Sequence, residues 1–402
     1  TQRSTLFPYT TLFRSHVANG AGGFSDVSAA ALVQGAANTS AVGGLVGFYN
    51  NSGSLTNGAA TGNVSGGFQT GGLVGQFTSN GNIVNGQASG HVSATGTGDV
   101  GGLLGQASGT GLLSNSSATG NVTGGAGADT VGGLVGEFSL TQGLVNSSSG
   151  SVGSTVSGGT NTGGLVGRST TNAAFVHDPG NGAVVSFRGA SVTGGNNGAT
   201  GGLIGRSNGT AALTGLSSSA TVSGIGIAGG LAGVTTGNVT NGTAMGSVTG
   251  SSYVGGLIGL AAGTATTIDN GRASGRVINT SVSNFTGGLV GYASGAGFTG
   301  GQADGDVSGG AYAGGLVGYM DSGRSISDAT ATGSVSGAAS AGGLAGYVSG
   351  AGSITGSSAG GSVTGTSTTS GSVGGLVGEF RMAGGISGSS AGGIVSGGSN
   401  TG

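Results

Sequence analysis

Residues 314–318 read Gly-Gly-Leu-Val-Gly, and the pentad Gly-Gly-Leu-x-Gly, with any residue at x, occurs twelve times in the chain. Neighbouring copies begin 26 to 38 residues apart, most often about 28. Self-similarity with a period of this size is typical of solenoids and other repeat architectures. The first glycines of the pentads are Gly43, Gly71, Gly101, Gly132, Gly163, Gly201, Gly229, Gly255, Gly287, Gly314, Gly342 and Gly374.

The pentad leucine is the first of three apolar positions in each repeat, which we call slots. The second and third slots follow the leucine at nearly equal intervals. After Leu316 they are Ile326 and Val335. The segments between slots are too short and too rich in glycine and β-branched residues for helices. Glycine, asparagine, serine and aspartate crowd the intervening positions, as tight bends require. Three sides of similar length therefore predict one turn of a three-sided coil.

The spacing departs from this rule at two places, and small residues mark one slot. The second interval is one position short between Leu144 and Val152, and the third is much longer than usual between Val184 and Leu203. We expect the insertions to bulge outward at a corner.

Near the end of each turn a small residue predicts an inward position where no larger side chain fits; the alanines there are Ala60, Ala88, Ala118, Ala273, Ala303, Ala331, Ala359 and Ala391.

A single repeat is not expected to fold alone. It has too few inward aliphatic side chains to offset the entropy of ordering about 28 residues. Stacked turns can pair every strand with its neighbours and bury a continuous core. The sequence therefore predicts an all-β fold, a parallel β-solenoid of about twelve three-sided rungs without capping segments.

Composition narrows the functional classes. The chain has 402 residues with 103 Gly, 2 Pro, no Cys, 5% charged residues and a formal charge of −2. There is no lysine, and the arginines are scattered, which argues against nucleic acid as a partner. No apolar run approaches the ~20 residues that span a bilayer, so no membrane span is expected in this sequence.

The ends of the sequence look unnatural. Residues 3–15, RSTLFPYTTLFRS, resemble a translated sequencing adapter, and the chain stops within a segment that parallels Thr160-Asn161-Thr162-Gly163. We therefore expect three regions. Residues 1–15 are an artefactual segment, 16–41 are a partial first repeat, and 42–402 are the repeat solenoid, truncated at its C-terminus.

The pentads resemble the GLUG-motif repeats, named for Gly-Leu-hydrophobic-Gly and seen here in Gly44-Leu45-Val46-Gly47 and Gly288-Leu289-Val290-Gly291. The resemblance covers roughly residues 42–402. Such repeats occur in bacterial surface proteins, including filamentous-haemagglutinin-like adhesins, and in non-catalytic parts of some immunoglobulin-A-cleaving metallopeptidases. The resemblance implies an exported, extracellular or cell-surface repeat region.

Few residues of the sequence could form a catalytic, cofactor or metal site. His91 and His177 occupy different slots with no glutamate nearby, and we expect both to be surface residues. Asp304 and Asp306 flank Gly305 at a corner, but the Gly-Gly-x-Gly-x-Asp signature of calcium-binding β-rolls does not recur. The sequence therefore predicts no enzyme, no cofactor and no metal site.

The position three residues after each pentad leucine varies most, which favours a solvent-facing row. If the turns stack in register, Glu137 lies beside Arg168, while Tyr292, Tyr319 and Tyr347 form an aromatic ladder. The ladder can be cross-turn stabilisation. It can also be a flat recognition strip for carbohydrate or a host surface.

These observations lead to one functional expectation and two alternatives. We expect a non-catalytic stalk or adhesive region that contacts host-surface glycans, proteins or neighbouring cells and associates end to end through its uncapped edges. One alternative is the repeat region of a surface metallopeptidase whose catalytic domain lies elsewhere. The less favoured alternative is an ice-binding solenoid, because the candidate row mixes Ser65, Ser93, Thr123 and similar residues without paired threonines.

Overall fold

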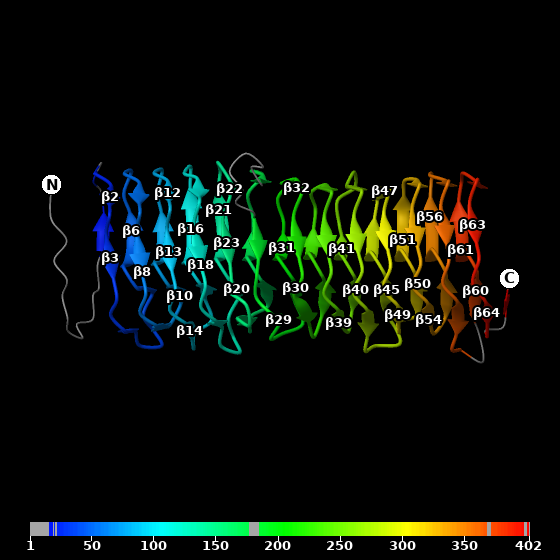
Figure 1. The fold of residues 1–402 in the computed structure, drawn as a ribbon, viewed down its shortest axis with the longest axis horizontal. Coiled ribbons are helices and arrows are strands. Elements are labelled where there is room, and N and C mark those ends of the chain that lie inside the picture. Colours follow the sequence, from blue (N-terminus) through cyan, green and yellow to red (C-terminus); the bar gives the residue numbers. More distant parts are fainter. Residues whose placement is uncertain are drawn as a thin grey trace. The chain divides into compact units, whose positions relative to one another are not determined.

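The computed structural model describes residues 16–18, 20, 22–176, 185–367, 371–397 and 400–401, so the predicted adapter-derived segment lies outside the described residues. Every regular element in these residues is a β-strand. The chain divides into unit 1, Thr1–Asn196 with Leu203–Ala211, and unit 2, Asn197–Gly202 with Ala212–Gly402. Each unit is a parallel β-solenoid, and the two together comprise about twelve turns (Figure 1). The fold class predicted from the pentads is confirmed.

Each turn contains five short strands, which we name by their place relative to the pentad. A leading strand ends on the first glycine of the pentad, and a trailing strand begins at its fourth residue. Second-slot, alanine and third-slot strands follow; the alanine strand is named for its usual residue, which serine or phenylalanine replaces in three turns. Strands of one type pair in parallel with the same type in neighbouring turns, so each type forms its own sheet.

In unit 1 the strands of each type stack in chain order. The leading strands are β5 (Ala41–Gly43), β10 (Gln69–Gly71), β15 (Asp99–Gly101), β20 (Thr130–Gly132) and β25 (Asn161–Gly163). The trailing strands are β1 (His16–Ala18), β6 (Val46–Asn50), β11 (Val74–Thr78), β16 (Leu104–Gly109), β21 (Val135–Leu140), β26 (Val166–Ser169) and β31 (Ile204–Ser207). The second-slot strands are β2 (Phe24–Ser25), β7 (Leu55–Thr56), β12 (Ile83–Val84), β17 (Leu113–Ser114), β22 (Leu144–Val145) and β27 (Phe175–Val176). The alanine strands are β3 (Ser28–Ala29), β8 (Ala59–Ala60), β13 (Gln87–Ala88), β18 (Ser117–Ala118), β23 (Ser148–Ser149) and β28 (Ser186–Phe187). The third-slot strands are β4 (Val33–Gln34), β9 (Val64–Gly66), β14 (Val92–Ala94), β19 (Val122–Thr123), β24 (Thr155–Ser157) and β29 (Ser191–Thr193).

Unit 2 repeats the same five types. The leading strands are β30 (Ala199–Gly201), β35 (Ile227–Gly229), β40 (Tyr253–Gly255), β45 (Phe285–Gly287), β50 (Tyr312–Gly314), β55 (Ser340–Gly342), β60 (Ser372–Gly374) and β65 (Asn400–Thr401). The trailing strands are β36 (Ala232–Thr235), β41 (Ile258–Ala261), β46 (Val290–Ser294), β51 (Val317–Gly323), β56 (Ala345–Gly350) and β61 (Val377–Met382). The second-slot strands are β32 (Leu213–Thr214), β37 (Val239–Thr240), β42 (Thr267–Asp269), β47 (Gly297–Thr299), β52 (Ile326–Ser327), β57 (Ile354–Thr355) and β62 (Ile386–Ser387). The alanine strands are β33 (Ser217–Ser218), β38 (Thr243–Ala244), β43 (Arg272–Ala273), β48 (Gln302–Ala303), β53 (Thr330–Ala331), β58 (Ser358–Ala359) and β63 (Ser390–Ala391). The third-slot strands are β34 (Thr221–Ser223), β39 (Val248–Gly250), β44 (Val277–Asn279), β49 (Val307–Ser308), β54 (Val335–Gly337), β59 (Val363–Gly365) and β64 (Val395–Ser396).

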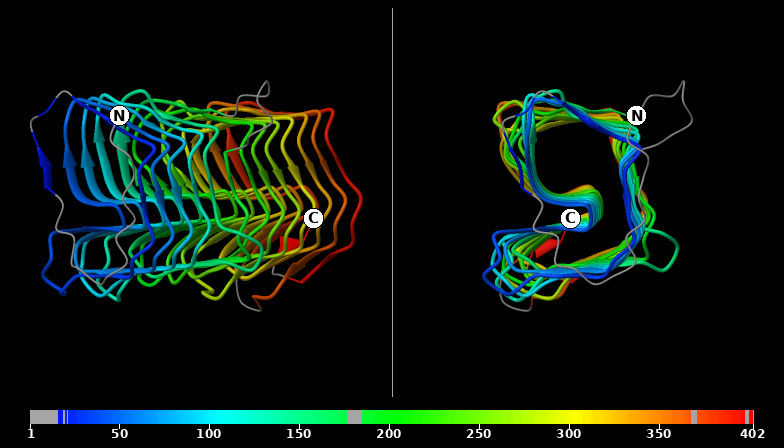
Figure 2. Two further views of the ribbon diagram at one scale, coloured as in Figure 1. Left: turned by 60° about the vertical axis from the view of Figure 1, so that its left-hand side comes forward. Right: turned by 90° about the vertical axis from the view of Figure 1, so that its left-hand side faces the viewer.

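The three predicted sides are subdivided into these five strands. The alanine strand lies between the second and third slots, and the leading strand lies between the third slot and the next pentad. Figure 2 shows each turn as a ring with one segment folded into its interior. A bend follows each second-slot strand, where Asn57, Asn85 and Asn115 have φ angles of 50° to 55°. Asparagine tolerates this left-handed conformation, which explains its recurrence at that bend.

The pentad glycines are required because backbone segments meet there without room for side chains. A Cβ on Gly101 would overlap the carbonyl oxygen of Leu104 across the pentad's own bend. A Cβ on Gly105 would lie 2.6 Å from the backbone nitrogen of Thr70, in the leading strand of the preceding turn. Only glycine permits such a close approach of leading and trailing strands.

The second pentad glycine explains the small-residue slot. A Cβ on Gly102 would overlap the carbonyl oxygen of Gly133 in the next turn and lie 2.9 Å from the Cβ of Ala118. The equivalent glycine–alanine contacts in the other turns span 2.7 to 3.1 Å. The alanines of this slot therefore point inward against the pentad, as the sequence predicts. Ser149, Phe187 and Ser218 replace alanine in three turns, and the Ser149 hydroxyl donates to the carbonyl oxygen of Gly164 at 2.6 Å. Phe187 is 2% exposed, so the prediction that no larger side chain fits this slot is wrong in its turn.

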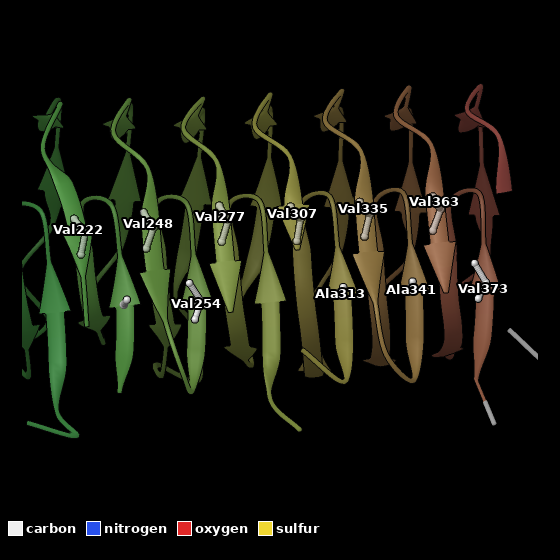
Figure 3. Close-up of a cluster of buried hydrophobic side chains, with 11 residues drawn as sticks. Val222, Val248, Val254, Val277, Val307, Ala313, Val335, Ala341, Val363 and Val373 are labelled. Carbon is white, nitrogen blue, oxygen red and sulfur yellow. The ribbon is translucent and has the colours of Figure 1, made fainter. Parts of the chain in front are cut away.

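The hydrophobic core is a set of columns that run from turn to turn. In unit 2 the third-slot valines pack against the middle residues of the leading strands (Figure 3). Val335 is 2% exposed, for example, and lies in the same cluster as Ala313 and Ala341. Leu316 and Ile326, from the other two slots, are fully buried. The three-slot pattern therefore identifies the core correctly in these turns.

Two slot assignments made from spacing alone, Val152 and Val184, are wrong. Val152 is 98% exposed in a loop, and the third slot of that turn is Val156, which pairs with Val122 and Val192. The following turn has Val192 in the third slot, whereas the predicted Val184 lies outside the described residues. In the first case an insertion between the alanine and third-slot strands displaces the valine from its expected spacing.

Candidate recognition strip

Two rows of side chains face each other beside the pentads, and we call them together the strip. The trailing row is the residue three after each pentad leucine, and the leading row is the first residue of each leading strand. In unit 1 the trailing row is Phe48, Gln76, Gln106, Glu137, Arg168 and Arg206, and the leading row is Ala41, Gln69, Asp99, Thr130 and Asn161. In unit 2 the trailing row is Val234, Leu260, Tyr292, Tyr319, Tyr347 and Glu379, and the leading row is Ala199, Ile227, Tyr253, Phe285, Tyr312, Ser340 and Ser372.

The predicted register of the trailing row is confirmed. Glu137 pairs with Arg168 across adjacent strands, and Tyr319 pairs with Tyr292 on one side and Tyr347 on the other. The members of this row are partly exposed to solvent, except Val234, which is buried. The facing leading row covers part of each side chain.

In unit 2 the strip is an aromatic cluster of six rings from both rows. Tyr253, Phe285 and Tyr312 of the leading row contact the three predicted tyrosines. The ring centroids of Tyr253 and Tyr292 are 5.1 Å apart, and those of Tyr312 and Tyr319 are 5.0 Å apart, both edge to face. Offset and edge-to-face pairs at these separations are favourable beyond the area that they bury.

The faces of the central rings are occupied by other rings. Tyr319 stacks on Phe285 and on Tyr347, in each case with 4.4 Å between centroids and interplanar angles of 16° and 8°. Because Phe285 precedes Tyr319 by one turn and Tyr347 follows it by one, both faces of Tyr319 are covered. The strip therefore presents ring edges and hydroxyl groups in place of the flat aromatic surface predicted from the sequence.

Charged groups contact the last and the first tyrosine of the trailing row. The guanidinium of Arg381 lies 5.8 Å from the ring centroid of Tyr347 and pairs with Glu379. The Tyr292 hydroxyl donates to Oδ2 of Asp321 at 2.9 Å. Burial, followed by the hydrogen bond to Asp321, raises the pKa of Tyr292. Burial, together with the neighbouring Tyr347, raises the pKa of Tyr319 to about 12.

In unit 1 the strip is a polar ladder. Gln76 donates to Oε1 of Gln106 at 2.9 Å, and Gln106 donates to Oε2 of Glu137 at 3.3 Å. Arg168 bridges two acids, with 3.1 Å between its guanidinium nitrogens and the carboxylate oxygens of both Asp129 and Glu137. The predicted pairing of Glu137 with Arg168 is confirmed.

Asp99 is the most perturbed acid of this ladder. It is 5% exposed, and the Thr130 hydroxyl donates to its Oδ1 at 2.7 Å. The pKa of Asp99 is raised to about 6, mainly by burial. The hydrogen bond from Thr130 lowers this pKa, and the negative charge of Glu137 raises it. Removing a carboxylate from water disfavours its charged form, which accounts for the direction of this shift.

The second arginine of the ladder has a different environment. Arg206 pairs in register with Arg168, and its Nε donates to Oδ1 of Asn161 at 3.0 Å. Burial lowers the pKa of Arg206, and the like charge of Arg168 lowers it further. For Arg168, burial lowers the pKa, but the hydrogen bond and charge of Glu137 outweigh burial and leave that pKa raised.

The other residues considered from the sequence lie away from the strip. His91 Nδ1 accepts from the backbone N–H of Asn121 at 3.0 Å, so this side chain takes part in a cross-turn hydrogen bond. His177 lies outside the described residues. Asp304 accepts from the Thr332 hydroxyl and Asp306 from the Ser334 amide, both at 2.9 Å. The residues that the structure describes contain no group of three or more histidine, cysteine, aspartate or glutamate side chains placed to hold a metal ion.

The row weighed for ice binding also stacks. Ser65, Ser93 and Thr123 are successive partners in the third-slot sheet of unit 1. In unit 2 Ile278 interrupts the row between Thr249 and Ser308. The row therefore has no continuous run of hydroxyl groups through unit 2.

Sequence reasoning missed the leading row. Tyr253, Phe285 and Tyr312 all stand two residues before the first glycine of a pentad, so their common offset was available. What the offset did not indicate is that the pentad bend brings this position opposite the trailing row. That juxtaposition follows from the close approach of the leading and trailing strands.

Comparison with known protein families identifies the repeat. The family model described as "The GLUG motif" matches residues 96–123, which include the pentad at Gly101 and the third-slot strand β19. The resemblance stated from the pentads is thereby confirmed. No curated protein and no solved structure shows significant similarity to the chain. No helix in the described part of the chain is long and apolar enough to cross a membrane.

Proposed function

We propose that this chain is a non-catalytic repeat region of an exported bacterial surface protein, which serves as a stalk and presents an adhesive strip. One observation carries the proposal: the glycine pentads lock turn upon turn in register, so that two rows of varied side chains are held beside each other along each unit. The backbone positions are invariant from turn to turn, whereas the chemistry of the strip changes from polar in unit 1 to aromatic in unit 2.

The repeated construction supports the stalk role. Each turn pairs with its neighbours through five sheets, so each turn lengthens its unit by about 4.8 Å. A coil of this kind is extended by adding repeats without changing the contacts of existing turns. Such a region can set the reach of a surface protein.

The strip supports the adhesive role. Its side chains are partly exposed, and six aromatic rings gather within unit 2. Tyrosine is suited to recognition because it combines a large apolar body with a hydroxyl group that can donate and accept hydrogen bonds. The partners that fit are glycans, proteins of a host surface or neighbouring cells. The GLUG motif is the further support for an extracellular location.

A binding survey tests the adhesive part. The purified chain is applied to immobilised matrix proteins, neutral and acidic glycans and bacterial cells, and we expect saturable binding to at least one of them. The triple variant Tyr292→Phe, Tyr319→Phe and Tyr347→Phe keeps the ring stack and removes the hydroxyl edges, so we expect weaker binding. Tyr49→Phe is the matched control, because it removes a hydroxyl from a fully buried ring. Absence of binding to every surface would reject the adhesive role and leave the stalk.

A further inference from the structure

The two arginines of the unit 1 strip form a donor-rich site in which, among the described residues, only Arg168 pairs with carboxylates. Arg168 uses its two terminal nitrogens on Asp129 and Glu137, and its Nε is buried with no hydrogen-bond partner. Among the described residues, the side chain of Arg206 in the next turn donates from Nε to the neutral amide of Asn161. Within the described residues no carboxylate forms an ion pair with Arg206.

The acids lie on one side of this pair only. Asp129 and Glu137 contact Arg168, and Glu137 stands one turn before it in the trailing row. Arg206 stands one turn after Arg168, so the neutralised arginine separates it from both carboxylates. Arg206 is therefore a partly buried positive charge beside another positive charge, and its lowered pKa agrees with that placement.

The Arg206 side chain is partly exposed, and its polar neighbours are Arg168 and Asn161. Thr170 and Asn208 directly follow the two trailing strands and are exposed. The guanidinium presents its donors in a fixed planar arrangement that matches the two oxygens of a carboxylate or sulfate. An anion bound there would supply the acceptors that the site lacks and would offset the repulsion between the two arginines.

We propose that Arg206, supported by Arg168 and Asn161, binds an oxyanion, and that its ligand is a carboxylate or sulfate group of an acidic polysaccharide. This inference rests on the proposed adhesive function and names a ligand class for the polar part of the strip. The formal charge of the whole chain is −2, so general attraction of polyanions to the protein is weak. Binding of a polyanion therefore has to come from a local site.

The test measures binding of the full chain to polygalacturonate, dextran sulfate and uncharged dextran by titration calorimetry at constant ionic strength. We expect saturable binding to at least one acidic polymer and none to dextran. Arg206→Gln should weaken that binding by about tenfold or more, as expected for loss of a charge-assisted hydrogen bond. Arg206→Lys should restore part of it. Arg272→Gln is the control, because it makes the same charge change at a residue that is 59% exposed and outside the strip.

Three results would overturn the site. They are no binding of either acidic polymer, unchanged binding by Arg206→Gln, and equal weakening by Arg206→Gln and Arg272→Gln. Competition by free sodium sulfate separates recognition of the anionic group alone from recognition of the polymer. A chain that adheres to neutral glycans or to proteins while binding no acidic polymer would keep the proposed function and reject this inference.

Discussion

The pentad glycines should be irreplaceable, and Gly315 offers a sharp test. A Cβ at this position would overlap the carbonyl oxygen of Gly343 in the next turn and lie 2.8 Å from the Cβ of Ala331. Both neighbours are held by backbone that cannot rotate away. The substitution Gly315→Ala therefore has to push two turns apart. Gly392 provides the control, since a Cβ there would meet nothing within 4 Å.

The size of the effect follows from the contacts that would be disturbed. Separating the turns strains the hydrogen bonds from the Gly315 amide to Gly342 and from the Leu316 amide to Leu344, now 3.2 and 2.8 Å long. Overpacking costs about 1–3 kcal/mol, and each weakened buried hydrogen bond adds about 1 kcal/mol. We expect Gly315→Ala to lower the free energy of unfolding by about 3–5 kcal/mol. Gly392→Ala should raise it by roughly 0.4–1 kcal/mol, because alanine restricts the unfolded chain.

Urea unfolding followed by far-ultraviolet circular dichroism measures both variants. With a denaturant dependence of about 2–3 kcal/mol per molar urea, Gly315→Ala should shift the midpoint down by about 1–2.5 M. Gly392→Ala should leave the midpoint unchanged or move it slightly upward. Equal midpoints for the two variants would refute the conclusion that close backbone approach requires the pentad glycines.

Asp99 and Tyr319 of the strip provide two further tests. Because the pKa of Asp99 is raised to about 6, its contribution to stability is fully present below the unfolded value near 4 and is lost as the pH rises through 6. In thermal melts, acidification from pH 7 to pH 4 should therefore raise the free energy of unfolding by up to ~2 kcal/mol, and Asp99→Asn should abolish this increase. An equal increase in the variant would show that other groups cause it. Tyr319→Ala should cost about 2–4 kcal/mol while Tyr319→Phe costs less than about 1, since only alanine removes the stack on Phe285 and Tyr347; similar losses in urea melts would contradict a role for ring stacking.

Much of the coil was predictable because its determinants are local and periodic. Each pentad has three glycines at fixed offsets, and all three permit close backbone contacts. Every copy therefore predicts the same bend. Equal spacing also placed Glu137 beside Arg168 and aligned Tyr292, Tyr319 and Tyr347. Those pairings need no knowledge of the tertiary arrangement beyond stacking in register.

The remainder depended on where the chain bends in three dimensions. Val156 escaped detection because the loop that contains Val152 lengthens one interval, and spacing alone cannot distinguish an exposed valine from a buried one. The partial burial of the trailing row arises from Tyr253, Phe285 and Tyr312, which belong to strands on the far side of the pentad bend. Sequence periodicity identifies such a row but not the row that faces it.

The central claim, a stacked solenoid with the pentad leucine inside, is tested most directly by circular dichroism on residues 16–402 and on Leu316→Asp. Leu316 is fully buried, and an aspartate there would be an unpaired charge in the core. We predict a β-sheet spectrum with a cooperative melt that the variant markedly weakens. A random-coil spectrum for both proteins, or identical melts, would contradict the account.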